Sequence, residues 1–567
     1  MGYMEEYKRW LNAPQLTDEE RAELEGIAGD EKEIESRFYA PLAFGTAGLR
    51  GTMAVGLNRM NVYIVRQVTQ AMAELAISAG GAERGVAIAH DSRINSRLFA
   101  TEAARVLAAN GVKVLLYDDL RPTPELSFAV RRYGCIAGIN ITASHNPSEY
   151  NGYKAYWEDG AQLPPEHADT VEQAVSKIDV FTGAKLCDFD EALASGKIQI
   201  LGAETDEEFL NCAFGETIDL GPVQRMGDKL SFVYTPFHGA GYKLVPEVLR
   251  RAGFKSVICV ESQMIPDGNF PTVASPNPEN AEGFACALEV AKEHGVSLII
   301  GTDPDADRVA AVARDKSGEY RVLSGNQTGA LLLDYIITAR KRTGTLPEKP
   351  FAVKTIVSTD MAKTICDMNG VNLYETFTGF KFIAEKINAK EAQGEHSIFS
   401  FEESIGYLIG GYCRDKDAVT ATLLIAEMAA YYAERGETLV DALEALYAKY
   451  GAFSEKTINV VMPGLDGAEK IKALMARLRS GSEKMPLAVT ASIDYIDGVK
   501  TYADGKTEQT ELIGADVLSY EFEGGSKLLA RPSGTEPKIK FYVLAQGKTM
   551  AEAEQVRDTI CAFVNAL

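Results

Sequence analysis

Residues Gly85 to Leu120 read GVAIAHDSRINSRLFATEAARVLAANGVKVLLYDDL and contain the clearest indication of the fold class. A short apolar segment, VAIA, is followed by a polar loop. The loop leads into RLFATEAARVLAAN, where apolar residues recur three and four positions apart, as in an amphipathic helix. A second apolar segment, VKVLLY, closes the stretch. Short apolar strands are typical of buried parallel sheets, and the strand–helix–strand order implies a right-handed crossover, so this stretch predicts an α/β unit.

The same plan occurs twice more, from Leu230 to Gln263 and from Phe351 to Phe380. From about Lys456 the pattern changes to alternating strands and amphipathic helices, which predicts a small α+β domain with an antiparallel sheet. We expect the segment from Gly215 to Met226 to end the first linker. We therefore predict an α/β protein with three related α/β domains, whose sheets are mixed or parallel, plus a C-terminal α+β domain. The predicted limits are residues 1–210, 211–320, 321–455 and 456–567.

Composition excludes several classes of protein. The chain has 567 residues and a formal charge of −22, whereas a protein that binds duplex nucleic acid is normally basic. It contains no run of about 18 apolar residues, so no membrane span is expected. The N-terminus lacks an apolar signal-peptide core, and we predict a cytoplasmic location. The eight cysteines form no C-x-x-C pair, which indicates reduced thiols and no zinc site.

The first loop rich in polar and potentially reactive side chains is ITASHNPSEYNGYK, which follows the apolar run CIAGIN. Ser144 lies between the small Ala143 and His145, so its hydroxyl is expected to be exposed on a turn. Lys154 lies ten residues further on and could return to the serine. The alternative is an ordinary solvated turn, but the density of polar residues directly after a buried strand favours a functional loop.

The second loop is GTDPDADR, which follows the apolar segment VSLII. Its alternating aspartates, Asp303, Asp305 and Asp307, repel one another unless a cation neutralises them. Oxygen ligands without cysteine or histidine suit magnesium. A calcium loop of the EF-hand type would need a glycine and a glutamate where this sequence has Arg308 and Arg314. An acidic surface turn is the alternative, yet such a turn does not usually follow an apolar strand.

Three further loops carry weaker signals. FSFEESIGY, residues 399–407, offers carboxylates and a hydroxyl that could pair with sugar hydroxyls, or it is an acidic helix start. RPSGTEPK, residues 531–538, combines a forked guanidinium with hydroxyls and a glycine, which suits a terminal phosphate, although an arginine-capped turn is the alternative. FGTAGLRG, residues 44–51, permits a tight path that ends in a cation, Arg50.

Together these loops resemble the α-D-phosphohexomutase superfamily of phosphoglucomutases and phosphomannomutases. The ordered elements FGTAGLRG, TASHNP, DPDADR, FEESIG and RPSGTEP carry the resemblance across nearly the whole chain. The N-terminal arm with Trp10 and the phrase YTPFHGAG look most like the phosphoglucomutase-2-type branch, which includes phosphopentomutases. The resemblance implies four domains around a central cleft and reversible phosphoryl transfer between O1 and O6 of glucose, from glucose 1-phosphate to glucose 6-phosphate.

The resemblance also implies a role for each loop. Ser144 would be the phosphoserine and, with Asp303, Asp305 and Asp307, would hold one Mg²⁺ per chain. The implied catalytic group is completed by Arg50, Lys154, His145 and Arg308. The implied substrate-binding residues are Glu402, Ser404, Lys381, Arg531, Ser533, Gly534 and Thr535. The metal loop departs from many members at Pro304 and Ala306, and Ile405 to Tyr407 lack the histidine that some members carry.

The expected ligand is a small sugar phosphate, with glucose 1,6-bisphosphate as intermediate and activator, and the expected state is a monomer or homodimer. Activity on mannose or pentose phosphates remains open on the same scaffold. The rivals are a metal-dependent phosphatase, which would often use two metals where this sequence has only one compact aspartate cluster, and a non-catalytic sugar-phosphate sensor. The serine and all three aspartates are present, which favours the mutase.

Overall fold

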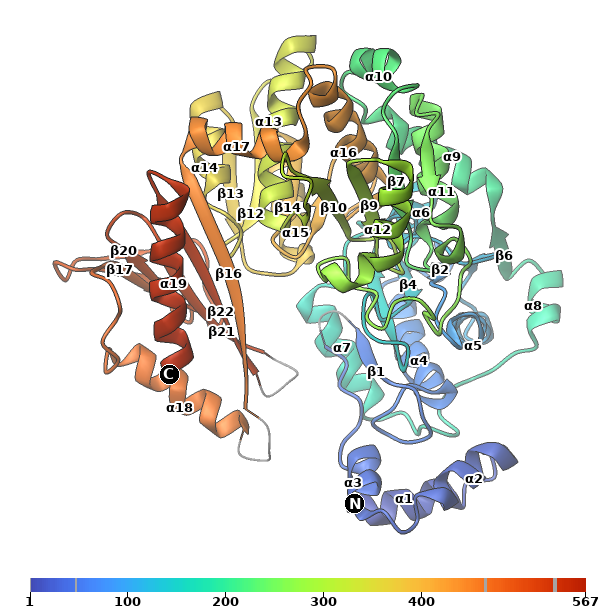
Figure 1. The fold of residues 1–567 in the computed structure, drawn as a ribbon. Coiled ribbons are helices and arrows are strands. Elements are labelled where there is room, and N and C mark those ends of the chain that lie inside the picture. Colours follow the sequence, from blue (N-terminus) through green and yellow to red (C-terminus); the bar gives the residue numbers. More distant parts are fainter. Residues whose placement is uncertain (1, 46–47, 463–466, 534–537) are drawn as a thin grey trace. The chain divides into compact units, whose positions relative to one another are not determined.

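The computed structural model describes residues 2–45, 48–462, 467–533 and 538–567 (Figure 1). The chain divides into two compact units. Unit 1 comprises Met1–Leu323 and Ile405–Gly436, and unit 2 comprises Ser324–Ser404 and Glu437–Leu567. No helix within the described ranges is long and apolar enough to cross a membrane.

The first sheet of unit 1 contains the stretch that opened the sequence analysis. Its strand order is β1-β5-β4-β2-β3-β6, in which β4, β2, β3 and β6 run parallel and β5 and β1 add an antiparallel edge. The predicted strand–helix–strand unit is confirmed as β2, α5 and β3. The strands are β1 Leu49–Thr52, β2 Val86–His90, β3 Val114–Tyr117, β4 Ala137–Ile141, β5 Tyr150–Trp157 and β6 Ile198–Leu201. The helices are α4 Val62–Ser78, α5 Ser96–Ala109, α6 Thr123–Tyr133, α7 Pro165–Val175 and α8 Phe189–Ala194.

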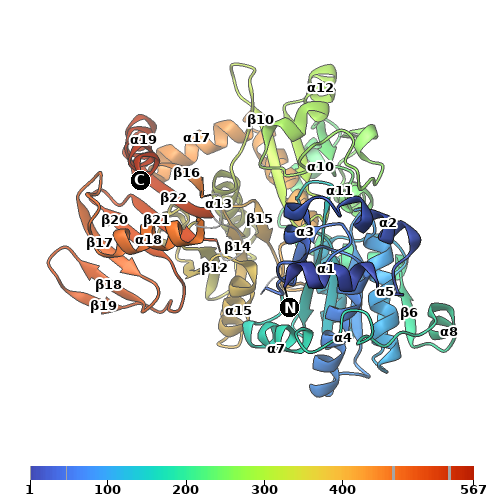
Figure 2. The same ribbon diagram turned by 90° about the horizontal axis from the view of Figure 1, so that it is seen from below.

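The N-terminal arm packs onto this first sheet's core. Its helices are α1 Tyr3–Leu11, α2 Asp18–Gly26 and α3 Glu31–Phe38, which lie together in dark blue in Figure 2. Trp10 is fully buried, with its ring 5.9 Å from that of Phe38, 5.7 Å from that of Tyr63 and 4.8 Å from that of Phe181. The arm therefore shares one hydrophobic core with the first α/β domain.

The second sheet of unit 1 has the order β11-β10-β9-β7-β8. Strands β8, β7 and β9 run parallel, while β10 and β11 are antiparallel, so the sheet is mixed. Its elements are β7 Phe232–Thr235, α11 Gly241–Ala252, β8 Val257–Cys259, η1 Glu261–Gln263, η2 Ala281–Phe284, α12 Ala285–His294, β9 Leu298–Thr302, β10 Val309–Arg314 and β11 Tyr320–Val322. The expectation of a linker over residues 215–226 is wrong, because α9 Ala203–Gly215 is followed by another helix, α10 Leu220–Met226, whose Pro222 and Val223 are buried.

A segment from the middle of the chain belongs to unit 1. Residues 405–436 contain β15 Gly406–Leu408 and α16 Ala418–Ala433, and α16 packs against α10 and α11. Thirteen consecutive residues of α16, from Ala418 to Ala430, are buried, which explains why apolar residues occur on every side of this helix. The predicted third domain, 321–455, includes residues 405–436, whereas in the structure this segment belongs to unit 1.

Unit 2 contains the third repeat and the C-terminal domain. Strand β12 pairs in parallel with β13 and β14. The C-terminal sheet is antiparallel in the order β16-β22-β21-β20-β17-β18-β19, and α18 and α19 pack on it (Figures 1 and 2). The elements of the third repeat and its flanking helices are α13 Gly325–Thr343, β12 Pro350–Thr355, α14 Met361–Asn369, β13 Asn372–Thr376, α15 Phe380–Glu391, β14 His396–Glu402 and α17 Leu439–Tyr450. Those of the C-terminal domain are β16 Ala452–Val461, α18 Gly467–Arg479, β17 Val489–Asp494, β18 Val499–Tyr502, β19 Thr507–Gln509, β20 Leu518–Phe522, β21 Lys527–Pro532, β22 Lys538–Gly547 and α19 Met550–Ala566. The predicted fold class is confirmed.

Candidate active site

Ser144 lies in the loop between β4 and β5 of unit 1. Its backbone has a φ of 53°, in the left-handed region, and its amide donates a hydrogen bond of 2.8 Å to the Thr142 hydroxyl. The expectation that its hydroxyl is exposed is wrong, since the residue is 2% exposed. Instead, Oγ donates to Asp303 Oδ2 at 2.9 Å and lies 3.1 Å from Nδ1 of His145. The first two predicted loops therefore meet at this serine.

The three aspartates form the turn between β9 and β10. The turn is tight, because Ala306 has a φ of 50° and the backbone amides of Asp307 and Arg308 donate to Asp303 Oδ1 at 3.2 and 3.0 Å. One carboxylate oxygen from each of Asp303, Asp305 and Asp307 lies within 4.8 Å of the others, and all three residues are buried.

The donor set of this turn fits a hard divalent cation. Among the described residues, Oδ1 of Asp305 and Oδ1 of Asp307 are buried and have no hydrogen-bond partner. A buried carboxylate oxygen without a partner is costly, and coordination of a metal ion by oxygen ligands removes that cost. The predicted aspartate cluster is thus a group that can hold a metal ion.

Two buried lysines contact the other side of the aspartates. Lys154 lies in β5, where its backbone is opposite Asn140, and its Nζ donates to Asp305 Oδ2 at 2.6 Å and to Asp307 Oδ2 at 2.9 Å. Lys416 Nζ lies 3.2 Å from the same oxygen of Asp307 and donates to Asp415 at 2.7 Å. Lys416 was not among the predicted site residues, because it lies outside the five loops and reaches the site only through the return of residues 405–436 to unit 1.

These contacts divide the charge among the aspartates. Burial raises the pKa of Asp303 well above its usual value, and the neighbouring carboxylates of Asp305 and Asp307 raise it further. Burial also acts to raise the pKa of Asp307, but the ammonium groups of Lys154 and Lys416 outweigh it and hold that pKa below its ordinary value. The two lysines therefore favour the ionised form of Asp307, whereas burial and the neighbouring carboxylates disfavour ionisation of Asp303, the aspartate that contacts the serine.

The remaining predicted catalytic residues of unit 1 also lie near the serine loop. Burial lowers the pKa of His145 well below its usual value, and the nearby charges of Arg308 and Arg50 add to this, so the imidazole is neutral. Nε of Arg308 lies 3.7 Å from Asp307 Oδ1. Arg50, in β1, donates to the side-chain oxygen of Asn146 at 2.9 Å. The structure thus brings Ser144 and all the predicted catalytic side chains of unit 1 into one loop cluster.

The predicted sugar-binding residues lie in unit 2 at the end of β14. Glu402 is buried, and its Oε1 accepts a hydrogen bond of 2.9 Å from the amide of Gly379, whose φ of 116° favours glycine. That contact joins the loop of Glu402 and Ser404 to the start of α15, which carries Lys381. Burial lowers the pKa of Lys381 to about 8, and its ammonium lies 4.8 Å from the centre of the Phe382 ring.

The predicted phosphate-binding residues lie on the hairpin of β21 and β22. Arg531 is directly opposite Lys540, and the amide of Ser533 donates to the carbonyl of Lys538 at 2.8 Å. Together with Pro532 these four residues line a hollow of about 160 Å³. Gly534 and Thr535 lie outside the described residues. Lys540 was missed by the sequence analysis, although its place two residues after Lys538 puts both lysines on one face of β22.

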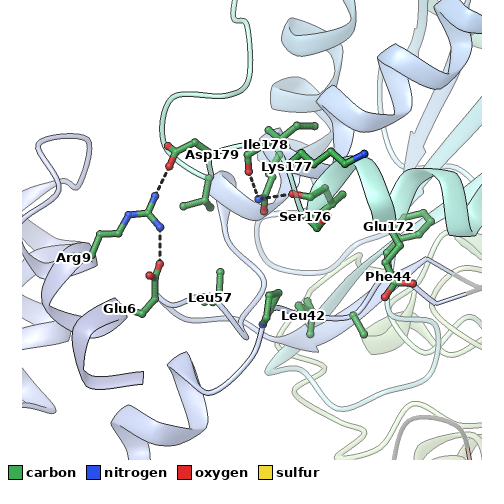
Figure 3. A pocket seen from close by; sticks show the side chains of 15 residues that line it. Glu6, Arg9, Leu42, Phe44, Leu57, Glu172, Ser176, Lys177, Ile178 and Asp179 are labelled. Carbon is green, nitrogen blue, oxygen red and sulfur yellow. Dashed lines mark hydrogen bonds and ion pairs between the residues drawn. The ribbon is translucent and has the colours of Figure 1, made fainter. Parts of the chain in front are cut away.

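A larger hollow of unit 1 is separate from these residues. Figure 3 shows a cavity of about 550 Å³ beside α1, lined in part by Glu6, Arg9, Leu42, Phe44 and Asp179. Arg9 lies between the carboxylates of Glu6 and Asp179 and pairs with both. None of the predicted site residues that the structure describes lines this cavity.

Comparison with known proteins agrees with the geometry. Three family models match consecutive parts of the chain: phosphoglucomutase/phosphomannomutase α/β/α domain I over residues 41–181, domain II over residues 212–318 and domain III over residues 324–450. A phosphoglucomutase of Staphylococcus saprophyticus is 34% identical over 93% of this chain and 94% of its own length. One of Staphylococcus epidermidis is 38% identical over 88% of this chain and 90% of its own length.

Solved structures show the same fold at lower identity. A phosphoglucomutase from Paramecium, pp63/parafusin, superposes with a TM-score of 0.70 at 18% identity, over 93% of this chain and 94% of its own. A putative phosphomannomutase from Thermus thermophilus gives a TM-score of 0.67 at 24% identity, over 93% of this chain and 99% of its own. The chain therefore belongs to the phosphoglucomutase/phosphomannomutase family, within the α-D-phosphohexomutase superfamily. It is a sugar-phosphate mutase of the phosphoglucomutase type.

Proposed function

We propose that this enzyme interconverts glucose 1-phosphate and glucose 6-phosphate through a phosphorylated Ser144 and a glucose 1,6-bisphosphate intermediate. The observation that carries the proposal is the 2.9 Å contact between Ser144 Oγ and Asp303, one of three clustered aspartates. The choice of glucose is supported by the relatives named phosphoglucomutase, at 34% and 38% identity.

In this proposal Asp303, Asp305, Asp307 and the phosphate on Ser144 hold one Mg²⁺. When bound, the ion neutralises negative charge on the transferring phosphoryl group. Lys154 and Lys416 fix the carboxylates of Asp305 and Asp307 through their 2.6 to 3.2 Å contacts, so that the cluster is organised before substrate arrives.

The reaction proceeds by exchange of one P–O bond for another. The bond between phosphorus and Ser144 Oγ breaks as a bond forms to the free hydroxyl oxygen of the sugar, and the hydroxyl proton leaves to a nearby base. The resulting bisphosphate then reorients in the site and transfers its other phosphoryl group back to the serine oxygen, which leaves the isomerised sugar monophosphate as product. Arg50, His145 and Arg308 lie in the loop cluster where the phosphoryl group would transfer. The positive charges of the two arginines and the hydrogen bonding of the neutral His145 stabilise that group.

Unit 2 supplies the groups that hold the rest of the substrate. Glu402 and Ser404 bind sugar hydroxyls, Lys381 assists in binding the substrate, and Arg531, Ser533, Gly534 and Thr535 bind the phosphate that is not reacting. The basic hairpin of Arg531, Lys538 and Lys540 supports this role, since three cations side by side attract an anion. A cytoplasmic location and a monomeric or homodimeric state remain predictions.

The decisive assay offers purified enzyme with Mg²⁺ and trace glucose 1,6-bisphosphate four substrates in parallel: the 1-phosphates of glucose, mannose, glucosamine and ribose. The expected result is isomerisation with glucose 1-phosphate giving the highest kcat/KM. Preference for mannose or ribose would redirect the proposal to phosphomannomutase or phosphopentomutase activity. Release of inorganic phosphate without isomerisation would overturn it in favour of a phosphatase.

A further inference from the structure

The loop that carries Ser144 needs an external support to keep its shape. Ser144 has a left-handed backbone, which is unfavourable for a residue with a side chain. The carbonyl oxygens that follow along the loop point to one side chain from a different loop, Arg93, which comes three residues after the end of β2. Arg93 has no place in the function described above.

The guanidinium of Arg93 gathers four carbonyl oxygens of the serine loop. Nη2 donates to the carbonyl of Ser144 at 2.6 Å and also to that of Asn146. Nη1 donates to the carbonyls of Pro147 and Tyr150 at 2.8 and 3.0 Å. These contacts span the whole loop between β4 and β5, so one planar group with fixed donors sets the loop's path.

The side chain of Arg93 is itself held in place by Asp91 and Phe270. Its side chain is fully buried beside Asp91, with Nε 3.3 Å from Asp91 Oδ2, and Asp91 Oδ1 accepts from the amide of Arg93 at 2.9 Å. The ring of Phe270 covers the guanidinium at 5.0 Å. A cation that is buried, paired and covered by an aromatic ring has little freedom to move.

The loop that carries Phe270 is anchored by the YTPFHGAG motif, which the sequence analysis quoted without assigning it a role. His238 of this motif lies 2.9 Å through Nδ1 from the carbonyl of Ile265 and 2.9 Å through Nε2 from the hydroxyl of Thr272, on either side of Phe270. The next residue, Gly239, lies against the aspartate turn, because a Cβ there would come within 2.3 Å of Pro304 Cα. The same motif therefore contacts the aspartate turn and the support of Arg93.

We propose that Arg93 is a positioning residue for phosphoryl transfer: by gathering the carbonyls of residues 144–150, it holds Ser144 Oγ at the aspartate cluster. The inference rests on the proposed function of Ser144. A displacement of about 1 Å at a reacting group can cost about 100-fold in rate. A residue that only stabilised the fold would lower the melting temperature and leave the rate per folded molecule unchanged.

The test compares Arg93→Lys with Arg97→Lys. A lysine at position 93 keeps the charge but cannot bridge four carbonyls, whereas Arg97 is exposed and its Nη1 donates to the carbonyl of Asp118. The measurements are the single-turnover rate of Ser144 phosphorylation by glucose 1,6-bisphosphate, the steady-state kcat and KM, and thermal unfolding. For R93K we expect the phosphorylation rate and kcat to fall about 100-fold with KM changed less than about threefold, and for R97K no change.

A graded variant keeps the test decisive if R93K does not fold. Phe270→Leu leaves every hydrogen bond of Arg93 in place and removes only the aromatic cover, so we expect a phosphorylation rate about three- to tenfold lower. Wild-type phosphorylation rates in folded R93K, or in F270L where R93K does not fold, would overturn the role of Arg93 and leave the proposed function intact. Failure of the wild-type enzyme to become phosphorylated on Ser144 would instead overturn the proposed function, and this inference with it.

Discussion

The loop cluster around Ser144 in unit 1 and the basic hairpin of Arg531 in unit 2 are both assigned to phosphate, yet they are built differently. Asp303 and Asp305 are 0% exposed and Asp307 is 1% exposed, and buried lysines pair with two of these carboxylates. Arg531, by contrast, is only half-buried, on a hairpin whose second strand, β22, carries Lys538 and Lys540. One region is a fixed ionic core and the other is a partly solvated cationic surface.

This difference indicates how the work is divided. Charges in a buried cluster interact strongly, and their geometry is set before substrate binds, which suits the reacting group. Removing one partner from such a cluster is costly, because it leaves another charge uncompensated. A half-exposed cation contributes less and tolerates several orientations of its ligand, which suits a phosphate that arrives from either end of a bisphosphate. The comparison predicts larger losses from changes in unit 1 than in unit 2.

The largest effect is expected for Ser144→Ala, which removes the phosphoryl carrier and barely changes volume. Isomerisation should fall by about 10⁴-fold or more, because no other nucleophile stands in that position. Intact-mass analysis should show partial phosphorylation of the wild type and none of the variant. Turnover close to that of the wild type in S144A would show that Ser144 does not carry the phosphoryl group. The loop cluster of unit 1 would then have no greater catalytic role than the hairpin of unit 2.

Asp305→Asn should have the next largest effect. The amide keeps the volume and removes one negative charge, and Lys154 retains its bond to Asp307, so folding should survive. We expect activity at ordinary Mg²⁺ concentration to fall about 100-fold and to recover in part with excess Mg²⁺. The matched control is Asp228→Asn, since that side chain is 68% exposed and should be neutral. Full activity of chelator-treated wild type without added metal would contradict the metal assignment.

A smaller loss is expected for Arg531→Ala in unit 2. Losing a charge-assisted hydrogen bond to a phosphate costs roughly 1.5–3 kcal/mol. The corresponding fall in kcat/KM is about 10- to 100-fold. It should appear with glucose 1-phosphate and with glucose 6-phosphate as starting substrate, while phosphorylation of Ser144 is largely spared. A loss confined to one direction, beyond what the reaction's equilibrium allows, would show that this hairpin does not serve both orientations.

The smallest effect concerns the pH dependence of Lys381. Burial lowers its pKa to about 8, so the ammonium is protonated below pH 8 and becomes neutral above it. A cation that binds an anionic substrate is thereby lost as pH rises, and KM should increase a few-fold between pH 7 and pH 9. The variant Lys381→Gln should show a higher KM at pH 7 and lack this rise. An identical pH profile in both proteins would exclude Lys381 from substrate binding.

Most of the local structure could be predicted from the sequence. Apolar strands such as VAIA and SVICV followed by amphipathic helices predicted the α/β units, because a strand buried on both faces must be continuously apolar. The alternation of Asp303, Asp305 and Asp307 predicted a cation-binding turn, since three adjacent carboxylates repel one another. These inferences depend on neighbours along the chain, which sequence reports directly.

The residues that complete the site from distant parts of the chain could not be predicted, because their contacts depend on tertiary packing. Lys416 reaches Asp307 because residues 405–436 pack with unit 1, and Arg93 reaches the serine loop from a different strand end. The segment HDSR, which contains Arg93, is a polar run at the end of a buried strand, as the other site loops are. The sequence does not show that Arg93 contacts the serine loop. The charge of a side chain is known from the sequence. Which carbonyls or carboxylates it contacts depends on how separate strands and helices pack. Packing also buries Ser144, although its place between the small Ala143 and His145 predicts an exposed hydroxyl on a turn.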